Sequence, residues 1–256
     1  MDITFAKPSS PSVGGLAVIA SENSGLAGTA ATLDKKMRGS LSRAMNSEKF
    51  TGKDGQFLVV LAPSGLRAER VILTGIGKGE KFDSGAAEKL GGRIVGHLKS
   101  LGVAYGAVAV DSIPGSELDA AAIAAHIGYG ASLRGYLFAR YKTRASRKSK
   151  PRTRKLTIMT SDPAKARTKY RPLRGVANGV FMTRDLVSEP ANILYPEELA
   201  ARTKNLINDG VKVEILTPTK MRELGMGALL GVAQGSAREP RMVVMQWHGA
   251  PNHAPK

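Results

Sequence analysis

The sequence contains no cysteine among its 256 residues. This excludes a disulfide framework, a thiolate metal site and a cysteine nucleophile, and it is typical of a reducing compartment. Long apolar runs are missing too, since no stretch reaches the ~18 residues that a membrane-spanning helix needs. Residues 1–8 lack the basic start and apolar run of a signal peptide. We therefore expect a soluble, cytoplasmic protein with no membrane partner.

Acidic residues are scarce in one segment. The chain carries a net charge of +17. Residues 140–174 hold fourteen basic residues and one acidic residue, so this segment alone contributes +13. The excess is therefore a local feature and not a property of the whole fold. The hydrophobic fraction of 42% is enough for a folded core.

The first two-thirds of the chain alternates between predicted strands and helices. Short apolar runs predict strands, and apolar residues at helical spacing predict helices. The predicted strands are 15–20, 57–62, 70–76, 106–110 and 156–160. The predicted helices are part of 28–44, 83–100 with Asp83 as its cap, and 116–141 with Ser116 as its cap. This order is typical of a largely parallel sheet that helices cover on both faces.

The last third has fewer strands. It predicts helices over 173–189 and 196–208, strands over 211–216 and 242–247, a short helix over 217–225, and a glycine-rich loop over 225–236. Two strands leave open sheet edges and little core. We expect domains at 1–172 and 191–256, joined by a linking helix over 173–190.

Common catalytic patterns are absent. None of His97, His126, His248 and His253 has a second metal ligand at helical spacing. No Gly-x-Ser-x-Gly elbow is present to support a serine hydrolase. Residues 75–79 (GIGKG) lie between a strand and a helix, where phosphate-binding loops occur. Glu80 and Lys81 stand where a Walker loop needs its hydroxyl residue, so we interpret 75–79 as a turn that needs glycine.

A basic run spans residues 140–155. It contains nine basic residues, no acidic residue and one aromatic residue, Tyr141. Such a run could bind phosphate backbones, although one aromatic residue gives little base stacking. The alternative is a solvated connection between a helix and a strand. The candidate contacts are Arg140, Lys142, Arg144, Arg147, Lys148, Lys150, Arg152, Arg154 and Lys155.

The most informative stretch is residues 184–199 (RDLVSEPANILYPEEL). Pro190 disfavours helical geometry at Glu189, so the incoming helix must end there. An extended loop is predicted over 190–195. The next helix begins with Pro196 and two carboxylates, Glu197 and Glu198, which complement the helix dipole. These residues form a joint between two helices.

This joint resembles that of the leucyl aminopeptidase family, the cytosol aminopeptidases of peptidase family M17. The resemblance continues at residues 221–236 (MRELGMGALLGVAQGS), at 239–241 (EPR) and, upstream, at 133–143 (LRGYLFARYKT). One departure is Tyr195, where the family often has a threonine helix cap. The resemblance implies an N-terminal domain like the macro-domain fold with a mixed, largely parallel sheet flanked by helices. A linking helix and an α/β zinc-peptidase-type domain follow, and in this sequence the latter is incomplete.

The resemblance also implies an activity for the family. Its members hold two divalent metal ions (Zn²⁺, Mn²⁺ or Mg²⁺), remove N-terminal residues from peptides through a metal-bridging water, and are typically homohexamers. Their metal ligands lie in a Gly-Lys-Gly-x-x-Phe-Asp-Ser/Thr-Gly-Gly segment and an Asn-Thr-Asp-Ala-Glu-Gly-Arg segment. Both follow the Gln-Gly-Ser loop, which here is 234–236, and neither occurs after it in this sequence.

Residues 77–85 (GKGEKFDSG) nevertheless match the first metal segment. Read alone, the match would make Lys78 and Asp83 metal ligands. We reject this reading because the match precedes the joint, Ala86 replaces the second glycine of the final pair, and no further carboxylates follow to hold two divalent ions.

These observations predict the N-terminal domain and the truncated start of the catalytic domain of a leucyl aminopeptidase. The chain alone is expected to bind no metal and to be inactive. Two alternatives remain. One is a non-enzymatic module that binds nucleic acid or another polyanion through the basic run. The other is an assembly partner that joins hexamers of a full-length homologue.

Overall fold

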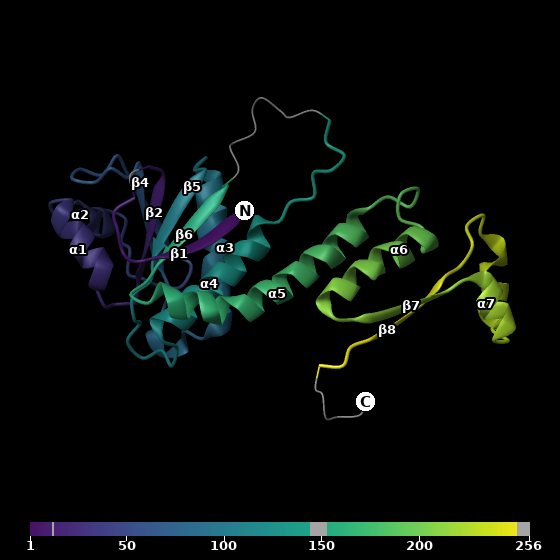
Figure 1. Cartoon of the computed structure of the whole chain (residues 1–256). Coiled ribbons are helices and arrows are strands. Elements are labelled where there is room, and N and C mark those ends of the chain that lie inside the picture. Colours follow the sequence, from purple (N-terminus) through teal and green to yellow (C-terminus); the bar gives the residue numbers. More distant parts are fainter. Residues whose placement is uncertain (12, 144–152, 250–256) are drawn as a thin grey trace. The chain divides into compact units, whose positions relative to one another are not determined.

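The structure is a computed structural model, and it describes residues 1–11, 13–143 and 153–249. The chain divides into two compact units, Met1–Phe181 (unit 1) and Met182–Lys256 (unit 2). The division falls inside one long helix, α5 (Pro163–Ser188). Figure 1 shows the helices and strands of each unit.

Unit 1 is built on one mixed sheet, in the order β1-β6-β5-β2-β4-β3. Neighbouring strands are parallel except β3 and β4, which are antiparallel. The strands are β1 (Asp2–Ala6), β2 (Gly15–Ala20), β3 (Phe57–Leu61), β4 (Arg70–Gly75), β5 (Tyr105–Ala109) and β6 (Lys155–Met159). The largely parallel sheet expected from the sequence is confirmed.

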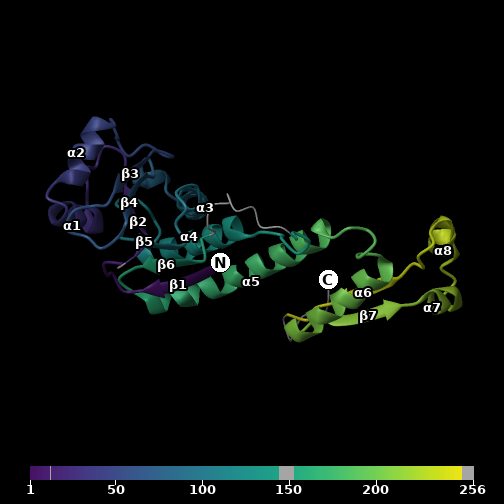
Figure 2. The ribbon, with the colours of Figure 1, turned by 90° about the horizontal axis from the view of Figure 1, so that it is seen from above.

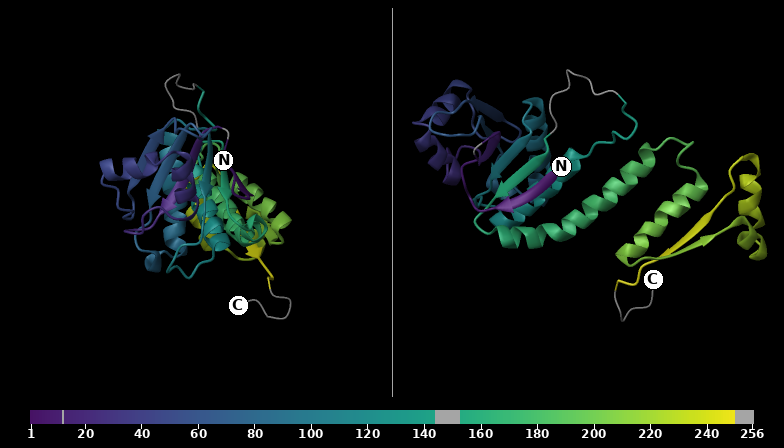
Figure 3. Two further views of the ribbon diagram at one scale, coloured as in Figure 1. Left: turned by 90° about the vertical axis from the view of Figure 1, so that its left-hand side faces the viewer. Right: turned by 45° about the horizontal axis from the view of Figure 1, so that its top comes forward.

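The N-terminal strand β1 was not predicted. It pairs in parallel with β6, from Asp2 opposite Lys155 to Ala6 opposite Met159. In the right-hand view of Figure 3, the purple strand at the N-terminus lies beside the teal strand β6. Only Phe5 of β1 is buried, and the sequence of the strand, DITFA, lacks the continuous apolar run that marks the inner strands.

Helices cover both faces of the sheet, as the apolar runs of the inner strands require. Side chains from alternate positions of β2 point to opposite faces: Leu16 and Val18 pack with α1 and α2, whereas Ala17 packs with α3 and α4. The helices in the described part of unit 1 are α1 (Gly28–Lys36), α2 (Ser40–Ser47), α3 (Ser84–Ser100), α4 (Ala120–Gly135) and the first part of α5, together with the 3-10 turn η1 (Gly79–Lys81). Figure 2 shows α1 and α2 on one side of the sheet and α3 and α4 on the other.

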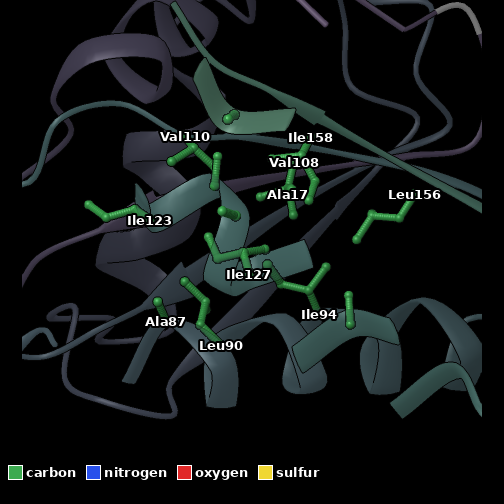
Figure 4. Packing of buried hydrophobic residues seen from close by; sticks show 14 of the residues in the cluster. Ala17, Ala87, Leu90, Ile94, Val108, Val110, Ile123, Ile127, Leu156 and Ile158 are labelled. Carbon is green, nitrogen blue, oxygen red and sulfur yellow. The ribbon is translucent and has the colours of Figure 1, made fainter. Parts of the chain in front are cut away.

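The larger core lies between the sheet and the pair α3–α4. Figure 4 shows Leu90 and Ile94 of α3 and Ile127 of α4 gathered near Val108 and Ile158 of the sheet, all of them buried. The two helices approach closely, because a Cβ on Gly91 would overlap the carbonyl oxygen of Ile127.

Two helix boundaries differ from the sequence prediction. The helix predicted from Ser116 to Tyr141 is α4, which spans only Ala120–Gly135. Asp119 caps it by accepting a hydrogen bond from the backbone N–H of Ala122 at 2.7 Å. Ser116 instead donates its hydroxyl to the Phe82 carbonyl oxygen, which anchors the preceding loop.

The linking helix also begins earlier than predicted. α5 starts at Pro163 rather than at Leu173, and Pro172 lies inside it. Asp162 accepts a hydrogen bond from the backbone N–H of Lys165, so an acidic cap followed by proline marks the true start. None of the helices in the described part of the chain combines the length and apolar character that crossing a bilayer requires.

Unit 2 contains a two-stranded antiparallel sheet of β7 (Lys212–Leu216) and β8 (Met242–Gln246). Its other elements are α6 (Pro196–Thr203), η2 (Lys204–Asp209), α7 (Pro218–Glu223), α8 (Gly227–Val232) and η3 (Ala233–Gly235). The prediction of a glycine-rich loop over 225–236 was wrong, because α8 and η3 occupy most of this segment. The helix predicted to reach 208 changes to 3-10 geometry after Thr203.

Candidate functional site

The joint between α5 and α6 is a tight turn. α5 ends at Ser188, one residue before Glu189, as Pro190 requires. The backbone N–H groups of Ile193 and Leu194 both donate to the Pro190 carbonyl oxygen at 2.9 Å. The extended loop predicted over 190–195 is therefore wrong, because these two hydrogen bonds fold the segment back on itself.

An ion-pair network fixes the joint to α6. The side chain of Glu189 is fully buried and accepts a hydrogen bond from Arg202 Nη1 at 3.0 Å. Arg202 Nε donates to Glu198 one helical turn away at 2.8 Å. The carboxylates of Glu198 and Glu189 raise the pKa of Arg202, which favours its charged guanidinium. The sequence shows that Glu198 and Arg202 are one helical turn apart, but it does not show that Arg202 also pairs with Glu189.

The segment before β8 returns to the start of α6. Arg241 Nη2 lies 3.5 Å from Glu197 Oε1. The guanidinium of Arg238 stacks 4.2 Å above the ring of Tyr195. Tyr195 occupies the N-cap position of α6 without a side-chain capping bond. It serves as a cation–π partner at a position where a threonine would serve as a cap.

The turn with the metal-segment match lies in unit 1. Asp83 is the N-cap of α3, and its Oδ1 accepts a hydrogen bond from the Ala86 backbone N–H at 2.8 Å. Gly77 has a positive φ of 72° and hydrogen-bonds through its backbone to Gly52 and Glu22. The backbone of Gly77 is thus paired within the chain, and Asp83 has a capping role.

A cleft of about 500 Å³ opens beside this turn. Its charged lining includes Lys78, Lys81, Lys89, Arg93, Asp54 and Asp83. Arg93 Nη2 donates to Asp54 Oδ1 at 2.6 Å. The remaining cations and carboxylates are mixed, so the cleft presents no uniform charge to a ligand.

The described residues do not fit a pair of divalent metal ions. Within 1–11, 13–143 and 153–249, no group of three or more His, Asp or Glu side chains converges on a point that could hold a metal ion. Such ions need several carboxylate oxygens. His126 instead lies 2.9 Å from Glu88, and the ring of His97 packs against that of Phe57, with 3.8 Å between the ring centroids.

The basic run is only partly described. Arg140, Lys142, Arg154 and Lys155 are exposed. Lys155 opens β6, whereas Arg140 and Lys142 follow α4. The ring of Tyr141 packs 5.8 Å from that of Phe138. The other candidates, Arg144, Arg147, Lys148, Lys150 and Arg152, lie outside the described residues.

Comparisons with known proteins place these features in one family. The model of the cytosol aminopeptidase family N-terminal domain matches residues 17–145, and the model of the family's catalytic domain matches residues 181–256. A "Probable cytosol aminopeptidase" of Caulobacter vibrioides is 41% identical over 92% of this chain and 46% of its own length. One of Methylorubrum extorquens is 40% identical over 99% and 50%. The chain thus spans about half the length of the curated relatives it matches.

Solved structures show the same fold. A tomato leucine aminopeptidase mutant superposes with a TM-score of 0.75 at 25% identity, covering 100% of this chain and 52% of its own. The bottromycin maturation enzyme BotP, at 22% identity and a TM-score of 0.70, shares the fold over 91% of this chain and 44% of its own. The two domain models match in order and together cover most of the sequence. The chain therefore belongs to the cytosol aminopeptidase family.

Proposed function

We propose that the chain supplies the N-terminal domain and the first part of the catalytic domain of a metal-dependent leucyl aminopeptidase. The observation that carries the proposal is the order of the two family models, with the N-terminal domain model followed by the catalytic model at residue 181. Within this proposal, residues 1–172 form the N-terminal domain, 173–190 the linking helix and 191–256 the start of the catalytic domain.

The proposed parent activity is hydrolytic removal of N-terminal residues from peptides. Two divalent ions, Mn²⁺ or Zn²⁺, would activate a water molecule and hold the peptide carbonyl. Peptide substrates, a homo-oligomer and a cytoplasmic location belong to the same proposal. The curated relatives, each named "Probable cytosol aminopeptidase", support the peptide substrates and the location. Lys78 and Asp83 are not assigned as metal ligands, because Asp83 caps α3 and lies in a turn that precedes the joint.

The 256-residue polypeptide by itself is proposed to be inactive. Its described residues provide no cluster of metal ligands. The test is to purify the polypeptide, add Mn²⁺ or Zn²⁺, and measure hydrolysis of leucine amide against a blank and against a full-length family member. We expect a rate equal to the blank, and a clear metal-dependent rate would overturn the proposal.

A second candidate function is binding of nucleic acid or another polyanion through the basic run. The net charge of +13 over residues 140–174 favours it. Part of this charge is already engaged, however, because Lys165 lies 2.9 Å from Asp119 and Arg167 donates to the Phe5 carbonyl oxygen. The test is a gel shift across a salt series with the nine candidate residues neutralised. Binding that survives moderate salt and depends on them would favour this function.

A further inference from the structure

Unit 2 has little core of its own. In its described residues, 182–249, the buried apolar side chains are Ala200, Leu216, Pro218 and Met221. α8 buries none of its residues. Unit 1, in contrast, buries two large clusters, one on each face of its sheet. Such a small core is weak support for an independent fold.

Large apolar side chains are instead exposed on unit 2. The described residues of unit 2 contain nine of them, against eight in the described part of the much longer unit 1. Val232 is 90% exposed, Trp247 70% and Met245 52%. The others are Val187, Ile193, Leu199, Ile207, Leu224 and Leu229. Single exposed apolar residues are normal, but this density is typical of a surface that another polypeptide covers.

The sheet of unit 2 also has an open edge. β8 pairs with β7, from Met242 opposite Leu216 to Gln246 opposite Lys212, and it has no second strand partner in the described part of the chain. A two-stranded sheet is marginally stable by itself. An open edge offers unpaired backbone groups to an added strand. Met245 and Trp247 lie on and just after this edge strand.

The comparisons indicate what covers this surface. All of this chain superposes on the tomato enzyme but accounts for only 52% of that protein, and the catalytic-domain model matches from residue 181. We propose that the apolar surface of unit 2 docks a polypeptide with the remaining sequence of a cytosol aminopeptidase catalytic domain, and that this polypeptide adds a strand to β8. The inference rests on the proposed function, because it takes 182–249 as the start of that domain.

The test uses the full 256-residue chain. It is co-expressed with the part of the Caulobacter relative that this chain does not match, and the mixture is analysed by size-exclusion chromatography with light scattering. We expect a one-to-one complex. We also expect amide hydrogen exchange in Met242–Gln246 to slow by about tenfold or more on binding, since added strand hydrogen bonds protect the edge.

Two variants and a matched control locate the docking surface. Val232→Asp and Met245→Asp each place a charge on the proposed surface and are expected to weaken binding about tenfold or more. Leu61→Asp is the control, because Leu61 is 65% exposed on β3 of unit 1. It is expected to leave binding unchanged. Circular dichroism checks that all three variants fold.

The outcomes separate the two proposals. No complex, equal weakening by Leu61→Asp, or self-association of this chain through β8 would each contradict the docking proposal. A complex that depends on Val232 and Met245 but shows no leucine amide hydrolysis supports docking and contradicts the proposed parent activity. A complex that hydrolyses leucine amide supports both.

Discussion

Gly91 and Gly92 are neighbours in α3 but have different surroundings. A Cβ on Gly91 would overlap backbone atoms of Ile127 and Ala131 in α4, whereas the nearest atom to a Cβ on Gly92 would be 3.8 Å away. Backbone atoms cannot move aside as a flexible side chain can. The contact between α3 and α4 therefore depends on one of the two glycines only.

We expect Gly91→Ala to lower the free energy of unfolding by about 1–3 kcal/mol, because it forces α3 and α4 apart. Gly92→Ala is the control and should be neutral or stabilising by up to about 1 kcal/mol, since alanine favours helix. Chemical denaturation of both variants measures the difference. Equal effects would show that the helices do not touch at Gly91.

We expect His97 to make the stability of unit 1 depend on pH. Burial lowers the pKa of its imidazole, and the nearby Arg93 guanidinium lowers it further. Its ring packs against that of Phe57 at a tilt of 30°, with 3.8 Å between the ring centroids. A histidine whose folded pKa lies below its unfolded value of about 6.5 binds protons more readily in the unfolded state.

We expect the stability contributed by neutral His97 to be complete above pH 6.5 and to be lost as the pH falls from 6.5 toward the folded pKa. His97→Gln should flatten this part of the profile while leaving the acid transition of the carboxylates. Thermal melts between pH 7.5 and 5 compare the two proteins. An unchanged slope in the variant would assign the effect to another group.

At the scale of single elements, α5 carries an exposed proline in its interior. Pro172 has no N–H to donate within the helix, and its ring crowds the preceding turn. Because the side chain is exposed, its loss would remove little packing.

We expect Pro172→Ala to stabilise unit 1 by about 1–2 kcal/mol. Alanine restores the helix hydrogen bond and relieves the crowding by the proline ring. This gain exceeds the stability lost because alanine leaves the unfolded chain more conformational entropy. Arg171→Ala, at the adjacent exposed position, should change stability by less than about 0.5 kcal/mol. Differential scanning calorimetry measures both. Destabilisation by Pro172→Ala would mean that the proline fixes a bend that the fold needs.

The elements also show what the sequence could and could not predict. The apolar runs of β2 and β4 and the Asp83 cap of α3 were correct because their signals are local. Two good capping residues, Ser116 and Asp119, compete before α4, and only tertiary contact with Phe82 decides between them. β1 is an edge strand defined by pairing with a distant segment, and no local pattern reveals that.

The candidate site, the joint between α5 and α6, could also be predicted only in part. Pro190 ended α5 and Pro196 began α6 as predicted, because proline restricts its own backbone. The buried Glu189 and its partner Arg202 are thirteen residues apart, across a turn whose shape the sequence did not give. An ion pair between residues this far apart in the sequence can be recognised only from the folded structure.

At the scale of the whole molecule, the two units differ in how much core they bury. Unit 1 packs both faces of a six-stranded sheet, whereas unit 2 buries few apolar side chains in its described part. Their stabilities should therefore differ.

We expect the isolated 256-residue chain to unfold in two steps, with unit 2 first, because local stability follows buried apolar contact. Hydrogen exchange read by mass spectrometry should show β7 and β8 exchanging at least about tenfold faster than β2 and β4. Equal protection in all four strands would contradict this difference in stability.

The partnership of β1 with β6 has a consequence for synthesis. β1 leaves the ribosome before its partner β6, whose pairing begins at Lys155. At about 5–20 residues per second, roughly 8–30 seconds pass before β6 is made. During that interval β1 has no partner strand, and this edge of the sheet forms only after almost all of unit 1 has been translated.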